Sequence, residues 1–150
     1  MRRLNIGCGN KRLEGWINID CVKTAATDIV RDLARGLPFE DSTVDEILCD
    51  NVLEHIGPPA DLIFILNEFY RVIRPGGLVV IIVPDGRSQG SCQDPTHMRS
   101  FVPRSALYWN QDLEWPKIYG ITANFDVQIE EYGDMATEAF IKFTCIARAK

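Results

Sequence analysis

Hydrophobic residues in the first half of the chain occur in short runs, and most of these runs end at a glycine or an acidic residue. Short apolar runs bounded by turn-forming residues are typical of β-strands. We therefore expect strands at residues 4–6, 16–20, 27–31, 44–49 and 78–83. The run from Leu78 to Val83 is uninterrupted, which is typical of a central parallel strand buried on both faces.

One segment instead follows the period of a helix. Between Pro59 and Arg74 the apolar residues recur three or four positions apart and form one stripe of an α-helix. Pro59 suits a first helical turn. We expect the helix to end at Arg74, because Pro75 disfavours the α conformation in the residue before it and two glycines follow.

The second half of the chain is less regular. Residues 85–96 are rich in Gly, Ser, Gln and Asp and are expected to form a loop, and residues 103–113 a helix. Two later runs, 125–132 and 139–147, predict an antiparallel hairpin joined at Gly133-Asp134. Strands that alternate with crossovers predict an α/β fold with a Rossmann-like, mostly parallel sheet. The segment after Gly9 is too short for a crossover helix, so the first crossover is abbreviated.

Composition and charge narrow the class of protein. A chain of 150 residues suits one domain, here residues 1–150, and a net charge of −5 disfavours a nucleic-acid partner. Five cysteines without C-x-x-C spacing and only two histidines predict neither a disulfide framework nor a metal site. We expect a cytoplasmic protein without a membrane partner, because neither a signal peptide nor a spanning run is visible.

Candidate ligand-binding residues follow the predicted strands, since ligands of such sheets bind beyond the carboxyl ends of the strands. Gly7-Cys8-Gly9 follows the first strand and lets the backbone approach a ligand closely. Asp20 ends the second strand and can accept hydrogen bonds from a ribose diol, and Asp32 can accept one from an adenine amino group. Taken singly, the glycine motif also fits a plain tight turn and Asp20 a surface acid at a strand end, whereas Asp32 alone is more often a cap or turn residue.

The order of these motifs carries more information than each motif alone. With the segments 51–56 and 71–77, it resembles the class I S-adenosylmethionine (SAM)-dependent methyltransferases, especially small members of the group similar to methyltransferase domain 11, over residues 3–85. The resemblance implies a seven-stranded sheet and SAM as the cofactor. It also implies cofactor contacts by Gly7, Cys8, Gly9, Asp20, Cys21, Asp32, Leu33, Asp50, Asn51 and Val52.

The chain departs from this family in two places. A further glycine after the first turn is missing. The N-terminal helices that often cover the substrate in this family are also missing, so a lid comes from elsewhere in the chain, from a partner chain or a second copy in a homo-oligomer, or does not exist. On the acceptor side, Asp94 to Phe101 resembles a D-P-x-H-x-x-x-F segment of some small methyltransferases. His97 is the candidate general base, or alternatively ties the loop together, and Asp94 and Arg99 are candidate substrate-binding residues.

These observations predict methyl transfer from SAM to a small-molecule or sugar-like acceptor by in-line displacement. Two alternatives remain open. The first is a non-catalytic SAM-binding or scaffold subunit, which the abbreviated crossover favours. The second is a nucleotide-dependent oxidoreductase, which the missing G-x-G-x-x-G spacing disfavours.

Overall fold

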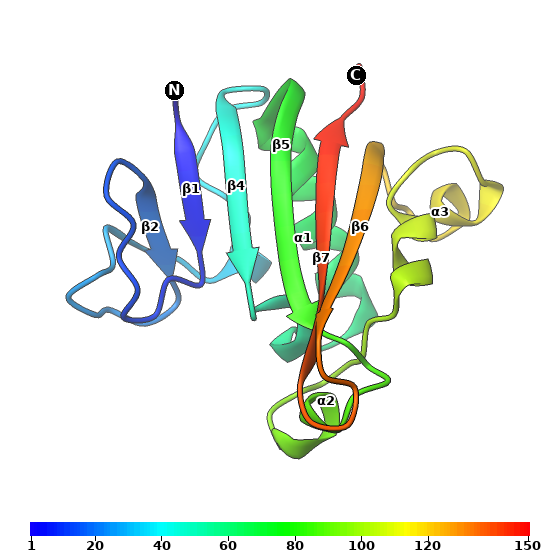
Figure 1. Cartoon of the computed structure of the whole chain (residues 1–150). Coiled ribbons are helices and arrows are strands. Elements are labelled where there is room, and N and C mark those ends of the chain that lie inside the picture. Colours follow the sequence, from blue (N-terminus) through cyan, green and yellow to red (C-terminus); the bar gives the residue numbers. More distant parts are fainter.

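The computed structural model describes all 150 residues, and seven strands form one sheet in the order β3-β2-β1-β4-β5-β7-β6 (Figure 1). The strands are β1 (Arg3–Ile6), β2 (Ile17–Asp20), β3 (Ile29–Val30), β4 (Val44–Asp50), β5 (Ile73–Pro84), β6 (Phe125–Gly133) and β7 (Ala139–Ala147). Strands β1 to β5 are parallel, and β7 lies antiparallel between β5 and β6. This arrangement confirms the predicted mostly parallel α/β sheet with a C-terminal hairpin.

A single long helix, α1 (Pro59–Val72), packs behind the sheet in the view of Figure 1. The other helices are short: η1 (Leu33–Arg35), η2 (Leu53–His55), α2 (Gln89–Gln93), η3 (Pro103–Tyr108) and α3 (Glu114–Ile118). Between β1 and β2 the chain forms turns and no helix, which confirms the abbreviated first crossover. None of these helices has both the length and the apolar character needed to cross a membrane.

Helix α1 ends two residues earlier than predicted. Its buried stripe of Ile65, Leu66, Phe69 and Val72 packs on the sheet as expected. Ile73, however, is already extended, with φ −69° and ψ 137°, and pairs with Val44 as the first residue of β5. The strand therefore begins before the Pro-Gly-Gly segment and runs through it, because this cross-strand pairing fixes the backbone at Ile73.

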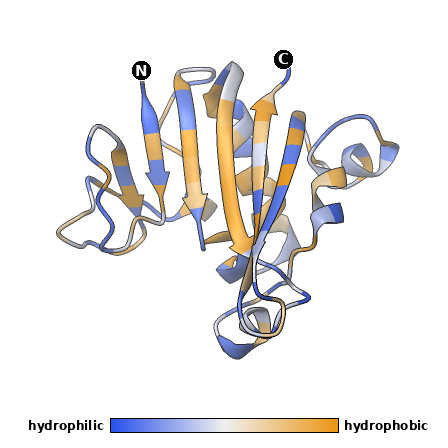
Figure 2. Cartoon of the chain, viewed as in Figure 1, coloured by the Kyte–Doolittle hydropathy of each residue, from blue (hydrophilic) through white to orange (hydrophobic).

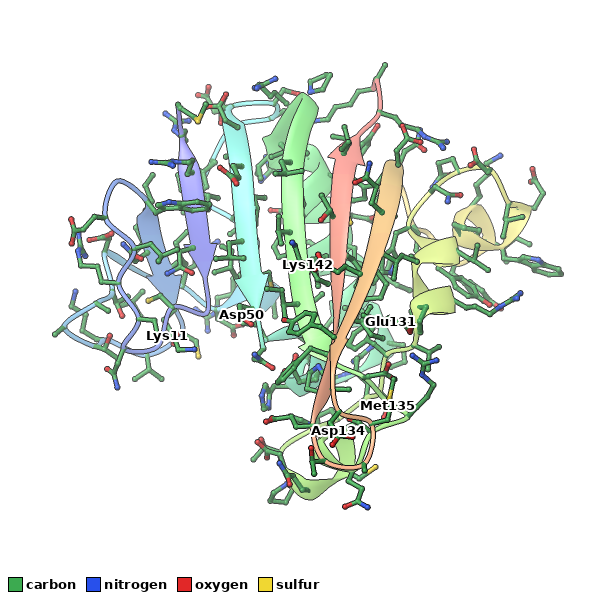
Figure 3. The ribbon with its side chains drawn as sticks, viewed as in Figure 1. Lys11, Asp50, Glu131, Asp134, Met135 and Lys142 are labelled. Atoms are coloured by element: carbon green, nitrogen blue, oxygen red, sulfur yellow. The ribbon has the colours of Figure 1, made fainter.

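Strand β5 is fully buried on one face only. In β5, Val79, Ile81 and Val83 are fully buried, whereas Leu78, Val80 and Ile82 are half-buried, so the prediction of a strand buried on both faces is wrong. Figure 2 shows β5 as apolar over most of its length, yet no helix crosses the front of the sheet. Lys142 projects from this front face (Figure 3) and alternates along β7 with the buried Ile141 and Phe143. Because no helix covers this face at β5, the face is left half open.

This one-sided burial predicts different responses to the same substitution at adjacent positions. Val79→Thr places a hydroxyl in the core and is expected to lower the free energy of unfolding by about 2 kcal/mol. Val80→Thr, on the half-buried face, is expected to change it by about 0.5 kcal/mol or less. Urea denaturation of both variants measures the difference. Equal losses at the two positions would contradict a half-open face.

Tertiary contacts reshape the segments after β5. The predicted loop 85–96 contains α2, where Gly90 donates its N–H to the carbonyl of Thr137 at 2.7 Å in the β6–β7 turn. The predicted helix 103–113 is the 3-10 helix η3, and a separate helix, α3, follows it. β3 is shorter than expected, because only Ile29 and Val30 pair with β2.

Candidate active site

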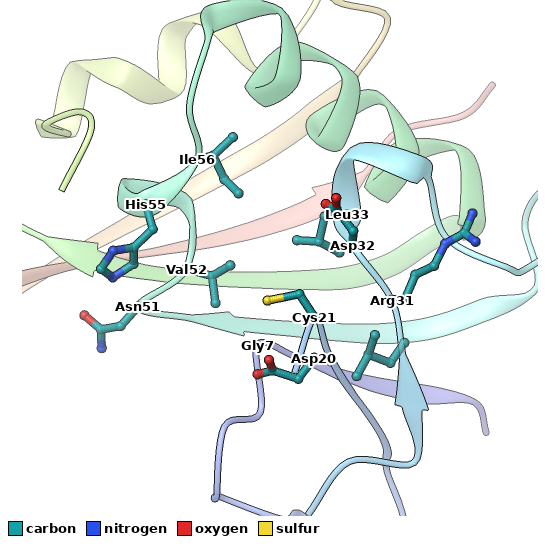
Figure 4. Close-up of a pocket in the computed structure, with 11 residues that line it drawn as sticks. Gly7, Asp20, Cys21, Arg31, Asp32, Leu33, Asn51, Val52, His55 and Ile56 are labelled. Atoms are coloured by element: carbon teal, nitrogen blue, oxygen red, sulfur yellow. The ribbon is translucent and has the colours of Figure 1, made fainter. Parts of the chain in front are cut away.

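The carboxyl ends of β1, β2 and β4 meet where the strand order reverses, between β1 and β4, which is the usual ligand position in such sheets. A cavity of about 360 Å³ lies there, and we call it the switch-point cavity (Figure 4). Its volume falls in the range of about 300–1,000 Å³ that small-molecule sites occupy. It is lined by seven of the ten predicted cofactor residues: Gly7, Asp20, Cys21, Asp32, Leu33, Asn51 and Val52.

The other three predicted cofactor residues line a neighbouring cavity. Cys8, Gly9 and Asp50 surround a space of about 240 Å³, which we call the glycine-turn cavity. It shares Gly7 and Asn51 with the switch-point cavity, so the two spaces are adjacent. The structure thus brings all ten predicted residues together.

The glycine turn after β1 has a backbone that other residues rarely adopt. Gly7 and Gly9 have φ values of +67° and +50°, in the left-handed region. The N–H groups of Gly7 and Cys8 both donate to the carbonyl of Ile19, at 2.8 and 3.1 Å, which holds the turn against β2. A Cβ atom on Gly7 would lie 2.2 Å from Cγ2 of Val52, so the turn packs directly on the segment after β4.

Asp20 joins the glycine turn to the end of β2. Its Oδ2 accepts the N–H of Gly9 at 2.8 Å, and its Oδ1 accepts the N–H of Val22 at 2.9 Å. A carboxylate has about four lone-pair sites, so each oxygen keeps one for a ligand. The neighbouring Cys21 has its pKa raised by burial and by the Asp20 charge, which keeps this thiol protonated.

Asp32 and Leu33 line the side of the switch-point cavity that follows β3. Asp32 caps η1 by accepting the N–H of Ala34 at 3.0 Å, and Leu33 adds an apolar surface beside it. Ile19, Arg31, His55 and Ile56 also line the cavity and were not predicted to do so. Their position follows from strand register and from the turn after β4, neither of which a motif in the sequence reveals.

Asn51 occupies the point where three cavities meet. It has φ +53°, a left-handed conformation that asparagine tolerates better than most residues. Its N–H donates to Ile82 at 2.9 Å, and its side-chain amide donates to Asp50 Oδ1 at 2.8 Å. The third cavity, of about 240 Å³, is mainly polar, and we call it the polar cavity. It shares Asn51 and His55 with the switch-point cavity.

His97 and Asp94 line the polar cavity, whereas Arg99 does not. His97 Nδ1 lies 2.9 Å from the carbonyl of Ser91, and its Nε2 lies 3.8 Å from Asp94 Oδ2. Thr96 donates its N–H and hydroxyl to Asp94, and these hydrogen bonds lower the pKa of the Asp94 carboxyl. The loop residue His97 therefore has a fixed orientation, and its role as a base stays a prediction.

The side chain of Arg99 forms hydrogen bonds with backbone carbonyl groups. Its guanidinium donates to the carbonyls of Ile56, at 3.0 Å, and of Gly57 and Pro58, and so ties the loop to the start of α1. These bonds use Nε and Nη2 of the guanidinium and do not involve Nη1. Substrate binding by Arg99 and Asp94 stays a prediction.

Glu54 is the functional candidate that the sequence did not reveal. The side chain is buried, at 1% exposure, and neither carboxylate oxygen has a hydrogen-bond partner among the protein groups. Burial raises the pKa of this carboxyl. Its carbonyl accepts the N–H groups of Met98 and Arg99, at 2.8 and 3.3 Å, which fixes the loop of His97 beside it. The only signal in the sequence is a glutamate next to a histidine in an otherwise apolar segment.

A parallel sheet that is closed by an antiparallel β7 between β5 and β6, with a cavity at its switch point, is the fold of class I methyltransferases. The chain belongs to the methyltransferase domain family, whose model matches residues 4–81. S-adenosylmethionine is the cofactor of this family, as expected from the sequence. The glycine turn and the carboxylate at the end of β2 fit such a ligand.

Similar proteins agree with this family. An uncharacterized methyltransferase of Mycobacterium leprae is 48% identical over 52 residues, which are 35% of this chain and 18% of that protein. The matched region is thus a small part of the relative. The crystal structure of a SAM-dependent methyltransferase from Archaeoglobus fulgidus has a TM-score of 0.68 at 18% identity and covers 96% of this chain and 86% of its own.

A second solved structure shares the fold and holds the product form of the cofactor. The 1,6-didemethyltoxoflavin N1-methyltransferase of Burkholderia thailandensis, solved with S-adenosylhomocysteine and its acceptor, has a TM-score of 0.68 at 15% identity. The match covers 98% of this chain and 71% of that protein. At this identity the likeness concerns the fold, and the acceptor of the present chain is a separate question.

Proposed function

We propose that this domain transfers a methyl group from SAM to a small polar acceptor, such as a sugar-like molecule, bound in the polar cavity. The observation that carries the proposal is that the polar cavity adjoins the switch-point cavity, whose lining is partly apolar. The switch-point cavity and the polar cavity share Asn51 and His55, so ligands in the two spaces would meet at these side chains. An acceptor therefore has a site beside the methyl donor.

The residues of the switch-point cavity would bind the cofactor in the following way. Asp20 keeps a free lone pair on each oxygen for the ribose hydroxyls, while Gly7, Cys8 and Gly9 give backbone access to the methionine part. Asp32 and Leu33 would contact the adenine ring, one by a hydrogen bond and one by apolar packing. Asp50, Asn51 and Val52 would form the floor of the cofactor pocket after β4, and Asn51 also lines the polar cavity.

When bound, SAM supplies a methyl group on a sulfonium, which an acceptor atom takes up by in-line displacement. The chain itself must align the two reactants, and alignment accounts for much of the rate gain in such reactions. An acceptor hydroxyl must also lose a proton. His97 faces the polar cavity with Nδ1 held by Ser91, which leaves Nε2 to receive that proton.

The direct test is acceptor-dependent formation of S-adenosylhomocysteine. We expect purified protein to release it in the presence of SAM and a member of a panel of small polyhydroxylated or amine acceptors. Mass spectrometry identifies the methylated product, and Asp20→Ala serves as the cofactor-binding control. Tight cofactor binding without turnover on any member of a broad panel would contradict the proposal and favour a non-catalytic SAM-binding subunit.

A further inference from the structure

Three side chains that can bind a metal ion converge at the edge of the polar cavity. Glu54, His55 and His97 each offer one ligand atom, and these three atoms lie within 4.8 Å of one another. Glu54 and His55 belong to η2, and His97 lies in the loop after α2. The two imidazole rings meet edge to face, with centroids 4.8 Å apart. The fold, and not proximity in sequence, brings the histidines together.

The hydrogen bonds of the histidines assign their protons. His97 Nδ1 faces the carbonyl of Ser91 at 2.9 Å, and because a carbonyl can only accept, Nδ1 carries the proton. His55 Nδ1 faces the hydroxyl of Thr96 at 3.0 Å, and that hydroxyl already donates its one proton to Asp94 at 2.7 Å. His55 Nδ1 is therefore the donor as well. In the neutral form of each histidine, Nε2 is then the unprotonated nitrogen and has a free lone pair.

The carboxylate of Glu54 and the two Nε2 atoms are all hydrogen-bond acceptors, and no protein donor satisfies the carboxylate. The Glu54 carboxylate is buried, and neither oxygen receives a hydrogen bond from the protein. A buried carboxylate without a partner is costly, and such groups are usually paired or coordinate a metal. The two imidazoles beside it add lone pairs and no protons. A cation satisfies all three groups at once.

We propose that Glu54, His55 and His97 bind a divalent transition-metal ion of the zinc class. Two histidines and one carboxylate are a ligand set that zinc accepts with one position left open. The hydrogen bonds that orient such ligands are present as well, since ligating histidines usually donate their other ring N–H to a carbonyl or a carboxylate-linked group. Here Ser91 holds His97, and Thr96 with Asp94 holds His55.

The position of this metal site gives it a place in the proposed reaction. All three ligands line the polar cavity and His55 also lines the switch-point cavity, so the ion would lie in the proposed acceptor site, at its border with the cofactor cavity. A hydroxyl bound to the ion would release its proton to solvent water more readily, so that His97 would serve as a ligand and not as the base. This role rests on the proposed methyl transfer, whereas binding of the ion does not.

Titration with Co²⁺ tests the site, because Co²⁺ replaces Zn²⁺ and its visible bands report coordination. The protein background carries Cys21→Ser and Cys92→Ser, since these two exposed thiols could bind metal independently. We expect visible bands without thiolate charge-transfer absorption, and displacement of the bands by Zn²⁺. Glu54→Gln and His97→Gln are expected to raise the dissociation constant of the metal at least tenfold. Thr96→Val is expected to raise it about tenfold, because the hydrogen bond that orients His55 is lost.

The matched control is Glu114→Gln, on the exposed side of α3, which is expected to leave metal affinity unchanged. Circular dichroism and binding of S-adenosylhomocysteine establish that each variant is folded, and if Glu54→Gln fails to fold, Thr96→Val decides. Absence of bands in the parent protein, or equal affinity in all variants, would overturn the proposal. Metal binding without methyl transfer would contradict only the proposed function.

Discussion

Asp20→Ala is expected to weaken binding of S-adenosylhomocysteine about 100-fold in calorimetric titration. The carboxylate keeps one free lone pair on each oxygen for the two ribose hydroxyls. Hydrogen bonds to a charged group contribute about 1.5–3 kcal/mol each, so loss of two costs about 3 kcal/mol, or about two powers of ten in affinity. Asp32, the other carboxylate that lines the switch-point cavity, follows β3 and not β2, so it does not replace Asp20 in this role.

The control for this variant must separate ligand contacts from the shape of the turn. Asp20 also accepts the N–H groups of Gly9 and Val22, so its removal loosens the segment around it. Asp32→Ala is the matched change, because Asp32 lines the same cavity and accepts one backbone N–H, that of Ala34. We expect a loss of about tenfold there, from one ligand bond. Equal affinities of Asp20→Ala and the parent protein would refute the assigned ribose contact.

Gly7→Ala is expected to lower the free energy of unfolding by about 3 kcal/mol. A side chain at φ +67° costs about 1–2 kcal/mol. The new Cβ would also lie 2.2 Å from Cγ2 of Val52, a stiff β-branched side chain, and overpacking of this kind costs about 1–3 kcal/mol. Because the turn must move away from Val52, we also expect cofactor affinity to fall. Urea denaturation measures the first effect and calorimetry the second.

Gly9→Ala is the comparison for this glycine. Gly9 has a similar positive φ of +50°, but a Cβ atom on Gly9 would meet no other atom within 4 Å. Its cost is therefore the backbone strain alone, about 1 kcal/mol. A Gly7→Ala variant as stable as Gly9→Ala would show that the turn and the segment after β4 are not in tight contact.

Features that depend on local pattern could be predicted from the sequence. The apolar stripe of α1, the β6–β7 hairpin and the glycine turn each follow from residues close together in the chain. The carboxyl ends of parallel strands share one edge of a sheet, so Asp20 and Asp32 could be assigned to one site from the sequence alone.

Features that depend on contacts between distant segments could not be predicted from the sequence. Leu78, Val80 and Ile82 are as apolar as their buried neighbours, and they are half exposed because no helix packs on their face of β5. The short helix α2 depends on the hydrogen bond from Gly90 to the hairpin turn. The cluster of Glu54 and the two histidines arises because the Glu54 carbonyl fixes the later loop, a contact between segments far apart in sequence.

The order of the strands also sets when the domain can finish folding during synthesis. β5 has β4 on one side, but its other neighbour is β7, the last strand of the chain. A nascent chain that has passed β5 still presents an unpaired strand edge, which is prone to pairing with other chains. The edge closes only when Ala139–Ala147 has left the ribosome. Truncation before β7 would therefore expose the middle of the sheet and not merely its margin.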